Sequence, residues 1–192
     1  MAQSESYQLR QFTSASLAAT RTMWQQQLKT HQKELLESEW ERVLDHAGKH
    51  INYAVGDQFC YGVFKEGGHA AVAIVVLVYR KEACKWLKLL ELNLCPAVDL
   101  SLTSHAVDFN KLSSIFAAAV FGTIQLTGTA HPTNVTKLYG RSGTLLAYLE
   151  GIQEYIQQSN TVPGLTVSIE GRWLVFEYEA QSDDSTGACH AL

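Results

Sequence analysis

The stretch that decides the fold is residues 70–96, which read AAVAIVVLVYRKEACKWLKLLELNLCP. From His69 to Tyr79 no polar side chain follows the histidine, and such an apolar run is typical of a strand that is covered on both faces. After a polar turn, the segment from Trp86 to Leu94 has the pattern of a second strand, which Pro96 ends. The sequence therefore predicts a central strand and a second strand directly after it.

Side chains of the second strand are expected to alternate between the two faces of the sheet, because successive residues of a strand point in opposite directions. With strict alternation, Leu90 and Leu92 lie on one face, and Leu89, Glu91 and Asn93 lie on the other. A carboxylate is unusual on such an apolar strand. Glu91 is therefore the first candidate for a chemical role.

Amphipathic helix is predicted on the N-terminal side of these strands. Between Arg21 and Ala47 apolar residues recur at three- and four-residue steps, with charged residues between them. A capping-box spacing at residues 38–41 indicates two helices joined near Glu37. The period then changes to two, and residues 51–64 with their Gly-Asp turn predict a hairpin.

The C-terminal half predicts helices and strands separated by turns that glycine and proline mark. In chain order we expect a polar loop at 97–107, a buried helix capped by Asp108, a strand at 135–139, a helix capped by Ser142, and a closing hairpin at 165–178.

Length and composition agree with one globular domain. The chain has 192 residues, of which 46% are apolar and 18% are charged. Its 3 prolines and 13 glycines exclude collagen-like and broadly disordered chains. We expect an N-terminal extension over residues 1–20, one α/β domain over 21–179 and a flexible C-terminal tail over 180–192.

Charge and cysteine usage restrict the expected partners. The 15 Lys and Arg against 19 Asp and Glu give a net charge of −4, which disfavours nucleic acid as a partner. The N-terminus lacks signal-peptide features and the apolar runs are too short to span a bilayer, which predicts a cytoplasmic protein without membrane contact. The 4 cysteines lack CxxC spacing and the 7 histidines are scattered, so no metal site is expected.

The order of elements resembles that of the GNAT superfamily of N-acetyltransferases. The sequences that carry the likeness are Tyr53-Ala54-Val55 with Tyr61-Gly62-Val63, the strand from Ala70 to Val78, the segment from Leu89 to Pro96, and Lys137 to Arg141 before a helix. The resemblance implies an α/β fold with a mixed, mostly antiparallel central sheet flanked by helices. It also implies an N-acyltransferase that takes an acyl group from acetyl-CoA, another acyl-CoA or a related donor, and passes it to an amine of a small molecule or a protein.

One departure from the family counts against a direct transfer of this function. The family binds the pyrophosphate of acetyl-CoA with a loop of the form Gln/Arg-x-x-Gly-x-Gly/Ala before the helix that follows the fourth strand. Here residues 96–111 contain no glycine and no arginine, and Asp99 and Asp108 would repel phosphate. We therefore expect a cofactor that is bound atypically or a domain that binds none.

The resemblance assigns roles around the second strand. Glu91 would deprotonate the acceptor amine, and the backbone from Leu92 to Cys95 would polarise the thioester. Desolvation on an apolar strand would suit Glu91 to act as a base near neutral pH. The alternative is a one-sided or edge strand on which Glu91 is solvated or paired with Lys88 or Lys137.

Further candidates follow the strand at 135–139. Arg141 and Ser142 could hold an anion at the start of the next helix, although helix capping alone explains Ser142. On that helix Tyr148 is the expected general acid toward the leaving thiolate, and a place at the core boundary is the alternative. His105 and Asp108 could form a His–carboxylate pair, but solvent exposure in a loop is the preferred interpretation.

A non-catalytic member of the same architecture is the rival hypothesis, because the glycine loop is missing. Such a domain would be a protein-binding or assembly module, with a protein partner or a second copy of the chain docked against an exposed Trp24 or Trp40. A small-ligand sensor with a phosphate at Arg141 is a third hypothesis.

Overall fold

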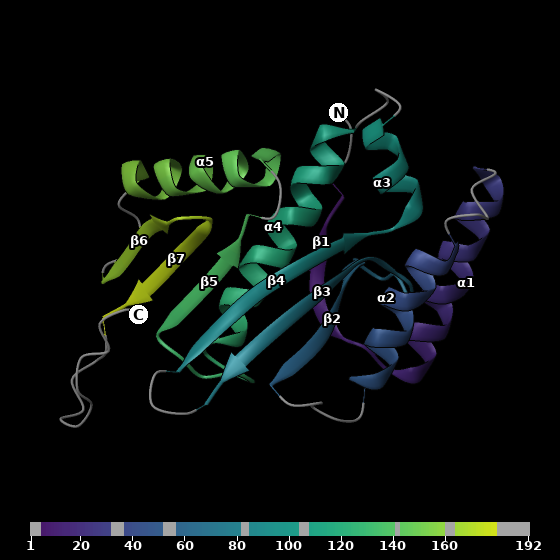
Figure 1. Cartoon of the computed structure of the whole chain (residues 1–192), viewed down its shortest axis with the longest axis horizontal. Helices are drawn as coiled ribbons and strands as arrows, with labels where there is room; N and C mark the ends of the chain where they lie inside the picture. The colour runs from purple at the N-terminus through teal and green to yellow at the C-terminus, as the bar shows by residue number, and fades with distance from the viewer. Residues whose placement is uncertain are drawn as a thin grey trace.

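One twisted sheet forms the centre of the molecule (Figure 1). The computed structural model describes residues 5–31, 37–51, 57–81, 85–103, 108–140, 143–159 and 164–179. Within these ranges the sheet is 7-stranded, in the order β1-β2-β3-β4-β5-β7-β6. The strands are β1 (Tyr7–Gln11), β2 (Gln58–Lys65), β3 (Ala71–Arg80), β4 (Trp86–Leu94), β5 (Val135–Tyr139), β6 (Leu165–Glu170) and β7 (Trp173–Tyr178).

Strand pairing confirms the predicted fold class. Neighbouring strands are antiparallel except β4 and β5, which are parallel. A parallel pair cannot be joined by a tight turn, so the chain crosses from the end of β4 to the start of β5 through two helices. The result is an α/β domain with a mixed, mostly antiparallel sheet.

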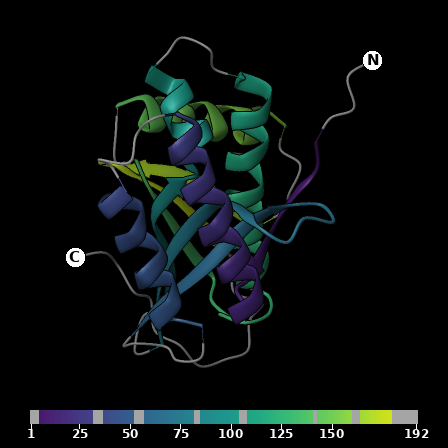
Figure 2. The same ribbon diagram turned by 90° about the vertical axis from the view of Figure 1, so that its right-hand side faces the viewer.

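Helices cover both faces of the sheet (Figures 1 and 2). They are α1 (Ser14–Thr30), α2 (Glu37–Lys49), α3 (Pro96–Thr103), α4 (Phe109–Leu126) and α5 (Gly143–Ser159). The helices α1 and α2 lie side by side on one face, and Arg21 of α1 forms ion pairs with Glu41 and Asp45 of α2. The helices α4 and α5 lie on the opposite face.

The core lies on both sides of β3, as its apolar run predicts. Residues Ala73 to Leu77 are buried without a break. Helix α1 covers one face with Trp24, which is fully buried, and α4 covers the other with Ile115 and Ala119. Each fully buried aliphatic or aromatic side chain of this kind contributes about 1.5–3 kcal/mol to stability.

The tryptophans of the N-terminal helices face inward. Trp24 is 0% exposed and Trp40 is 8% exposed, so the hypothesis that either one presents a partner surface is wrong. Their indole N–H groups donate to the carbonyls of Ala71 and Leu94, at 2.9 and 3.4 Å. The apolar faces of α1 and α2 therefore pack against the sheet.

The N-terminal segments differ from the sequence-based expectation. The two-helix interpretation is confirmed, but α1 begins at Ser14, and β1 precedes it within the segment expected to be an extension. The second arm of the predicted hairpin is β2, which pairs with β1 on one side and with β3 on the other. Residues 52–56 themselves lie outside the described ranges.

The segment after β4 also differs. Residues 97–103, predicted as loop, belong to α3, whose first residue is Pro96. Proline suits that position because the first N–H of a helix has no intrahelical acceptor. The tail at 180–192 lies outside the described residues. Among the helices that the structure describes, none combines the length and the apolar character needed to cross a bilayer.

Candidate functional site

Strand β4 contains a β-bulge in its middle. Val76 of β3 pairs with Glu91, and the next residue, Leu77, pairs with Leu89. Leu90 is therefore the extra residue of β4. A bulge bends its strand and redirects the side chains that follow it, and bulges are common beside active sites.

The bulge corrects the predicted assignment of side chains to faces. Leu90 lies with Glu91 and Asn93 on the face that α2 covers, whereas Leu89 and Leu92 share the face that α4 covers. Strict alternation placed Leu90 with Leu92, and Leu89 with Glu91. That expectation is wrong because an extra residue shifts the period of two by one position.

Beyond the bulge, β4 and β5 diverge (Figure 1). Their pairing covers Leu87–Leu89 of β4, which continues to Leu94. On the β3 side, the N–H of Cys95 donates to the carbonyl of Val72 at 2.8 Å. Hydrogen-bonded and non-hydrogen-bonded pairs alternate along an antiparallel ladder. Since Cys95 donates to β3, Leu92, three positions earlier, belongs to the other kind of pair. The N–H of Leu92 therefore points away from β3 and toward the gap left by β5.

A groove of about 400 Å³ lies between α2 and the sheet. Its polar and charged lining residues are Arg42 and His46 from α2, Gln58 from β2, and Glu91 and Asn93 from β4. The side chain of Glu91 is exposed there, and its Oε2 accepts a long hydrogen bond of 3.4 Å from Asn93 Nδ2. The expected desolvation of Glu91 is therefore not found, because its side chain opens into the groove.

The two lysines considered as partners of Glu91 make other contacts. Lys137 Nζ donates to Glu170 at 3.0 Å. Lys88 Nζ lies over two tryptophan rings, 4.1 Å from the centroid of Trp86. Glu91 thus faces the groove with Asn93 as its hydrogen-bonding neighbour.

On the opposite face of β4, the space between the diverging strands is nearly filled. A cavity of about 20 Å³ remains, lined by apolar residues that include Leu92, Leu138 and Leu149. This volume is close to what one water molecule needs. A thioester donor that entered between β4 and β5 would have to move these side chains apart.

The start of α4 is occupied by a carboxylate. Asp108 caps the helix, and its Oδ1 accepts a hydrogen bond from the N–H of Lys111 at 3.0 Å. A diphosphate would need the same N–H groups and would be repelled by Asp108. The residues described here do not fit the diphosphate of acyl-CoA at this helix end.

The other predicted site residues are only partly within the described structure. Cys95 is buried, and burial raises the pKa of its thiol. Its main-chain N–H donates to the carbonyl of Val72. Tyr148 lies in α5, but its side chain is outside the described set. Arg141, Ser142 and His105 lie outside the described ranges.

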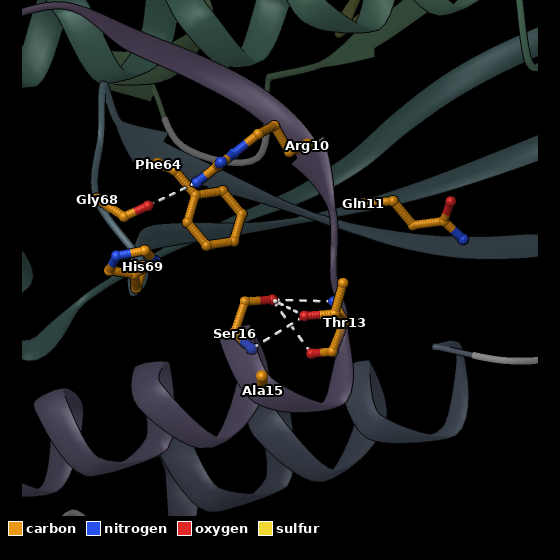
Figure 3. A pocket seen from close by; sticks show the side chains of 8 residues that line it. All are labelled: Arg10, Gln11, Thr13, Ala15, Ser16, Phe64, Gly68 and His69. Carbon is orange, nitrogen blue, oxygen red and sulfur yellow. Dashed lines mark hydrogen bonds between the residues drawn. The ribbon is translucent and has the colours of Figure 1, made fainter.

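A second groove, of about 440 Å³, lies between β1, the start of α1 and the turn after β2 (Figure 3). Arg10 crosses its rim, donating to the carbonyl of Gly68 at 2.7 Å with its guanidinium 4.2 Å from the ring of Phe64. Thr13 and Ser16 cap α1 reciprocally. Because these polar groups already satisfy one another, the groove beside Glu91 is the better candidate site.

Three residues that the sequence analysis did not bring together lie at the α2 groove. The potential ligand atoms of His46, His50 and Cys60 all lie within 4.8 Å of one another. The i, i+4 spacing of the histidines was the available signal, since it places them on one side of the chain at the end of α2. Cys60 is distant along the chain, and the packing of α2 on β2 is what adds it.

No family model and no curated protein matches the chain. Solved structures similar to it include a GNAT-family acetyltransferase of Staphylococcus aureus Mu50, with 6% identity and a TM-score of 0.38 over 88% of this chain and 98% of that one. The N-acetyltransferase PseH of Campylobacter jejuni is 14% identical, with a TM-score of 0.41 over 92% and 99%. The nucleotide-linked sugar GNAT FdhC is 11% identical, with a TM-score of 0.42 over 89% and 85%. These acetyltransferases are what the chain is similar to, at low identity and with TM-scores below 0.5.

Proposed function

We propose that the protein is an atypical N-acyltransferase that acts at the bulge of β4. The observation that carries this proposal is the proximity of two neighbouring groups of β4. Glu91 presents a carboxylate to the groove, and the N–H of Leu92 points into the gap between β4 and β5. A base and an oxyanion donor at one point are the groups that amide formation from a thioester requires.

In the proposed reaction the acceptor amine lies in the groove and attacks the thioester carbonyl carbon. A C–N bond forms, the carbonyl oxygen becomes an oxyanion that accepts a hydrogen bond from Leu92 N–H, and Glu91 takes the proton that the amine loses. The C–S bond then breaks, and Tyr148 of α5 supplies the proton that the leaving thiolate takes up. The products are an amide and a free thiol.

The proposed donor is a thioester held through its acyl and thiol end. Asp108 at the start of α4 disfavours a diphosphate, so the nucleotide of acyl-CoA would add little binding energy. The apolar lining around Leu92 and Leu149 suits an acyl chain once these side chains separate. A donor without the nucleotide, such as an acyl-pantetheine, should therefore react about as well as the corresponding acyl-CoA.

Comparing acetyl-CoA with acetyl-pantetheine tests this proposal. Both are incubated with the protein and a panel of amines of different charge, and release of free thiol is followed. We expect values of kcat/KM for the two donors within about tenfold of each other, a difference of about 1.4 kcal/mol or less. A preference for acetyl-CoA of several hundredfold would contradict the proposal that the donor is bound without its nucleotide. No thiol release from either donor would contradict the proposed acyltransferase activity.

The small cavity and the carboxylate at α4 favour a second candidate, a non-catalytic binding or assembly module. Its contact surface would include α4, where Phe109 is 73% exposed and Phe121 is 60% exposed. In that case neither donor raises the melting temperature, because neither donor binds the native state. Phe121→Ser would then weaken association in sedimentation experiments without lowering thermal stability.

A further inference from the structure

Three metal-ligating side chains converge between α2 and β2. His46 lies in the last turn of α2 and His50 directly after the helix, with ring centroids 4.6 Å apart, and Cys60 of β2 lies close to both. The potential ligand atoms of all three lie within 4.8 Å of one another. His50 is 7% exposed and Cys60 is 3% exposed, so two of the three side chains are buried, and His46 lines the groove beside Glu91.

His50 has an unused lone pair within this cluster. Its Nδ1 is buried and makes no hydrogen bond to any group in the described part of the chain. A buried ring nitrogen without a hydrogen-bond partner is destabilising, and a metal ion bound to it would remove that cost.

Cys60 supplies the third ligand atom from β2. Its side chain is buried, and the potential ligand atoms of all three residues lie close together. A bound metal ion would displace the proton of the thiol and hold the thiolate.

We propose that His46, His50 and Cys60 bind one Zn²⁺ ion, whose fourth position is open to the groove beside Glu91. Two imidazoles and one thiolate form a donor set that Zn²⁺ prefers, whereas Mg²⁺ and Ca²⁺ prefer oxygen ligands. Tetrahedral Zn²⁺ bonds separate neighbouring ligand atoms by roughly 3.3–3.6 Å. The present separations are within 4.8 Å, so binding requires the three side chains to move closer together, and the half-buried His46 has the most room to do so. The site is independent of the acyltransferase proposal, since Zn²⁺ binding requires neither donor nor acceptor.

Titration of metal-free protein with Co²⁺ tests the site directly. Co²⁺ takes the place of Zn²⁺ and gives a thiolate-to-metal charge-transfer absorption when a cysteine is bound. We expect this band to saturate at one ion per chain and to disappear when Zn²⁺ displaces Co²⁺. Folded protein that shows no such band would overturn the proposal, whatever the outcome of the acyl-transfer assay.

Two variants identify the ligands. His46→Gln changes a half-buried surface residue, so the fold should persist while the affinity for Co²⁺ falls at least about tenfold. Cys60→Ser should abolish the charge-transfer band, with circular dichroism as the check on folding. Cys95→Ser, which changes another buried cysteine, is the matched control and should keep both the band and the stoichiometry. Unchanged Co²⁺ affinity in His46→Gln, or an undiminished band in folded Cys60→Ser, would assign the metal to other residues and overturn the proposal.

Discussion

The indole Nε1 of Trp24 donates a hydrogen bond to the main-chain carbonyl of Ala71 at 2.9 Å, joining α1 to the first residue of the central strand β3. Both residues are fully buried. The N–H of Ala71 is satisfied from the same helix, since it donates to Thr20 Oγ1 at 2.9 Å. Helix α1 thus supplies both hydrogen bonds of a strand residue whose main chain is otherwise shielded from water.

Trp24→Phe should destabilise the fold strongly. The substitution leaves the carbonyl of Ala71 without its buried donor and opens a void beside β3. We expect the free energy of unfolding to fall by about 2–4 kcal/mol, measured by urea denaturation. Trp86→Phe on β4, which is partly exposed, is the control and should cost less than about 1 kcal/mol. Similar losses in both variants would mean that the Trp24 hydrogen bond does not contribute more to the free energy of unfolding than a partly exposed tryptophan does.

Gly122 and Gly151 should respond oppositely to alanine. A Cβ atom at Gly122 of α4 would lie 2.3 Å from Leu9 Cβ of β1, whereas one at Gly151 of α5 would meet nothing within 4 Å. Gly122→Ala is therefore expected to cost about 1–3 kcal/mol despite better helix propensity, and Gly151→Ala to stabilise by about 0.5–1 kcal/mol. Thermal unfolding of the pair measures both signs. A stable Gly122→Ala variant would contradict the close approach of α4 to β1.

His131 should make the fold sensitive to mild acid. Its Nε2 lies 3.0 Å from the hydroxyl of Tyr61, and burial, with a smaller contribution from Lys81, lowers its pKa. The unfolded chain then binds more protons than the native one, so stability is full above the unfolded pKa of about 6.5 and falls as the pH drops toward the lowered native pKa.

Unfolding free energies at about pH 7.5 and about pH 5.5 measure this effect. The wild type should lose stability between these conditions, and His131→Gln should lose less. Because burial also lowers the pKa of His50, some loss remains in the variant. The same loss in both proteins would show that His131 does not carry the acid sensitivity.

Glu91→Gln should separate chemistry from folding. If Glu91 accepts the proton of the amine, its loss should reduce kcat by about 10²–10⁴-fold in the thiol-release assay. Since Glu91 is exposed, the free energy of unfolding should change by less than about 0.5 kcal/mol. Glu177→Gln, an exposed position on β7, is the activity control. Equal rates in the wild type and Glu91→Gln would remove Glu91 from the mechanism.

Part of the candidate site follows from local sequence. A carboxylate on a strand of leucines singles out Glu91, and Asp108 reads as a helix cap, which the structure confirms. The outward turn of Glu91 could not be predicted, because it depends on the Leu90 bulge and therefore on the register with β3. Nor could the approach of His46 to Cys60, which lie on different elements.

The sequence by itself determined those features that depend on a few neighbouring residues. The apolar run of β3, the two N-terminal helices, and the turn between β6 and β7 at Gly171, whose φ is 62°, are of this kind. Only the tertiary structure decided that β1 forms the sheet edge beside β2, that Leu90 bulges, and that α2 lies over Cys60. Hydrophobic period and turn chemistry act over one or two turns of chain, whereas pairing register and helix placement are set by contacts between residues far apart in sequence.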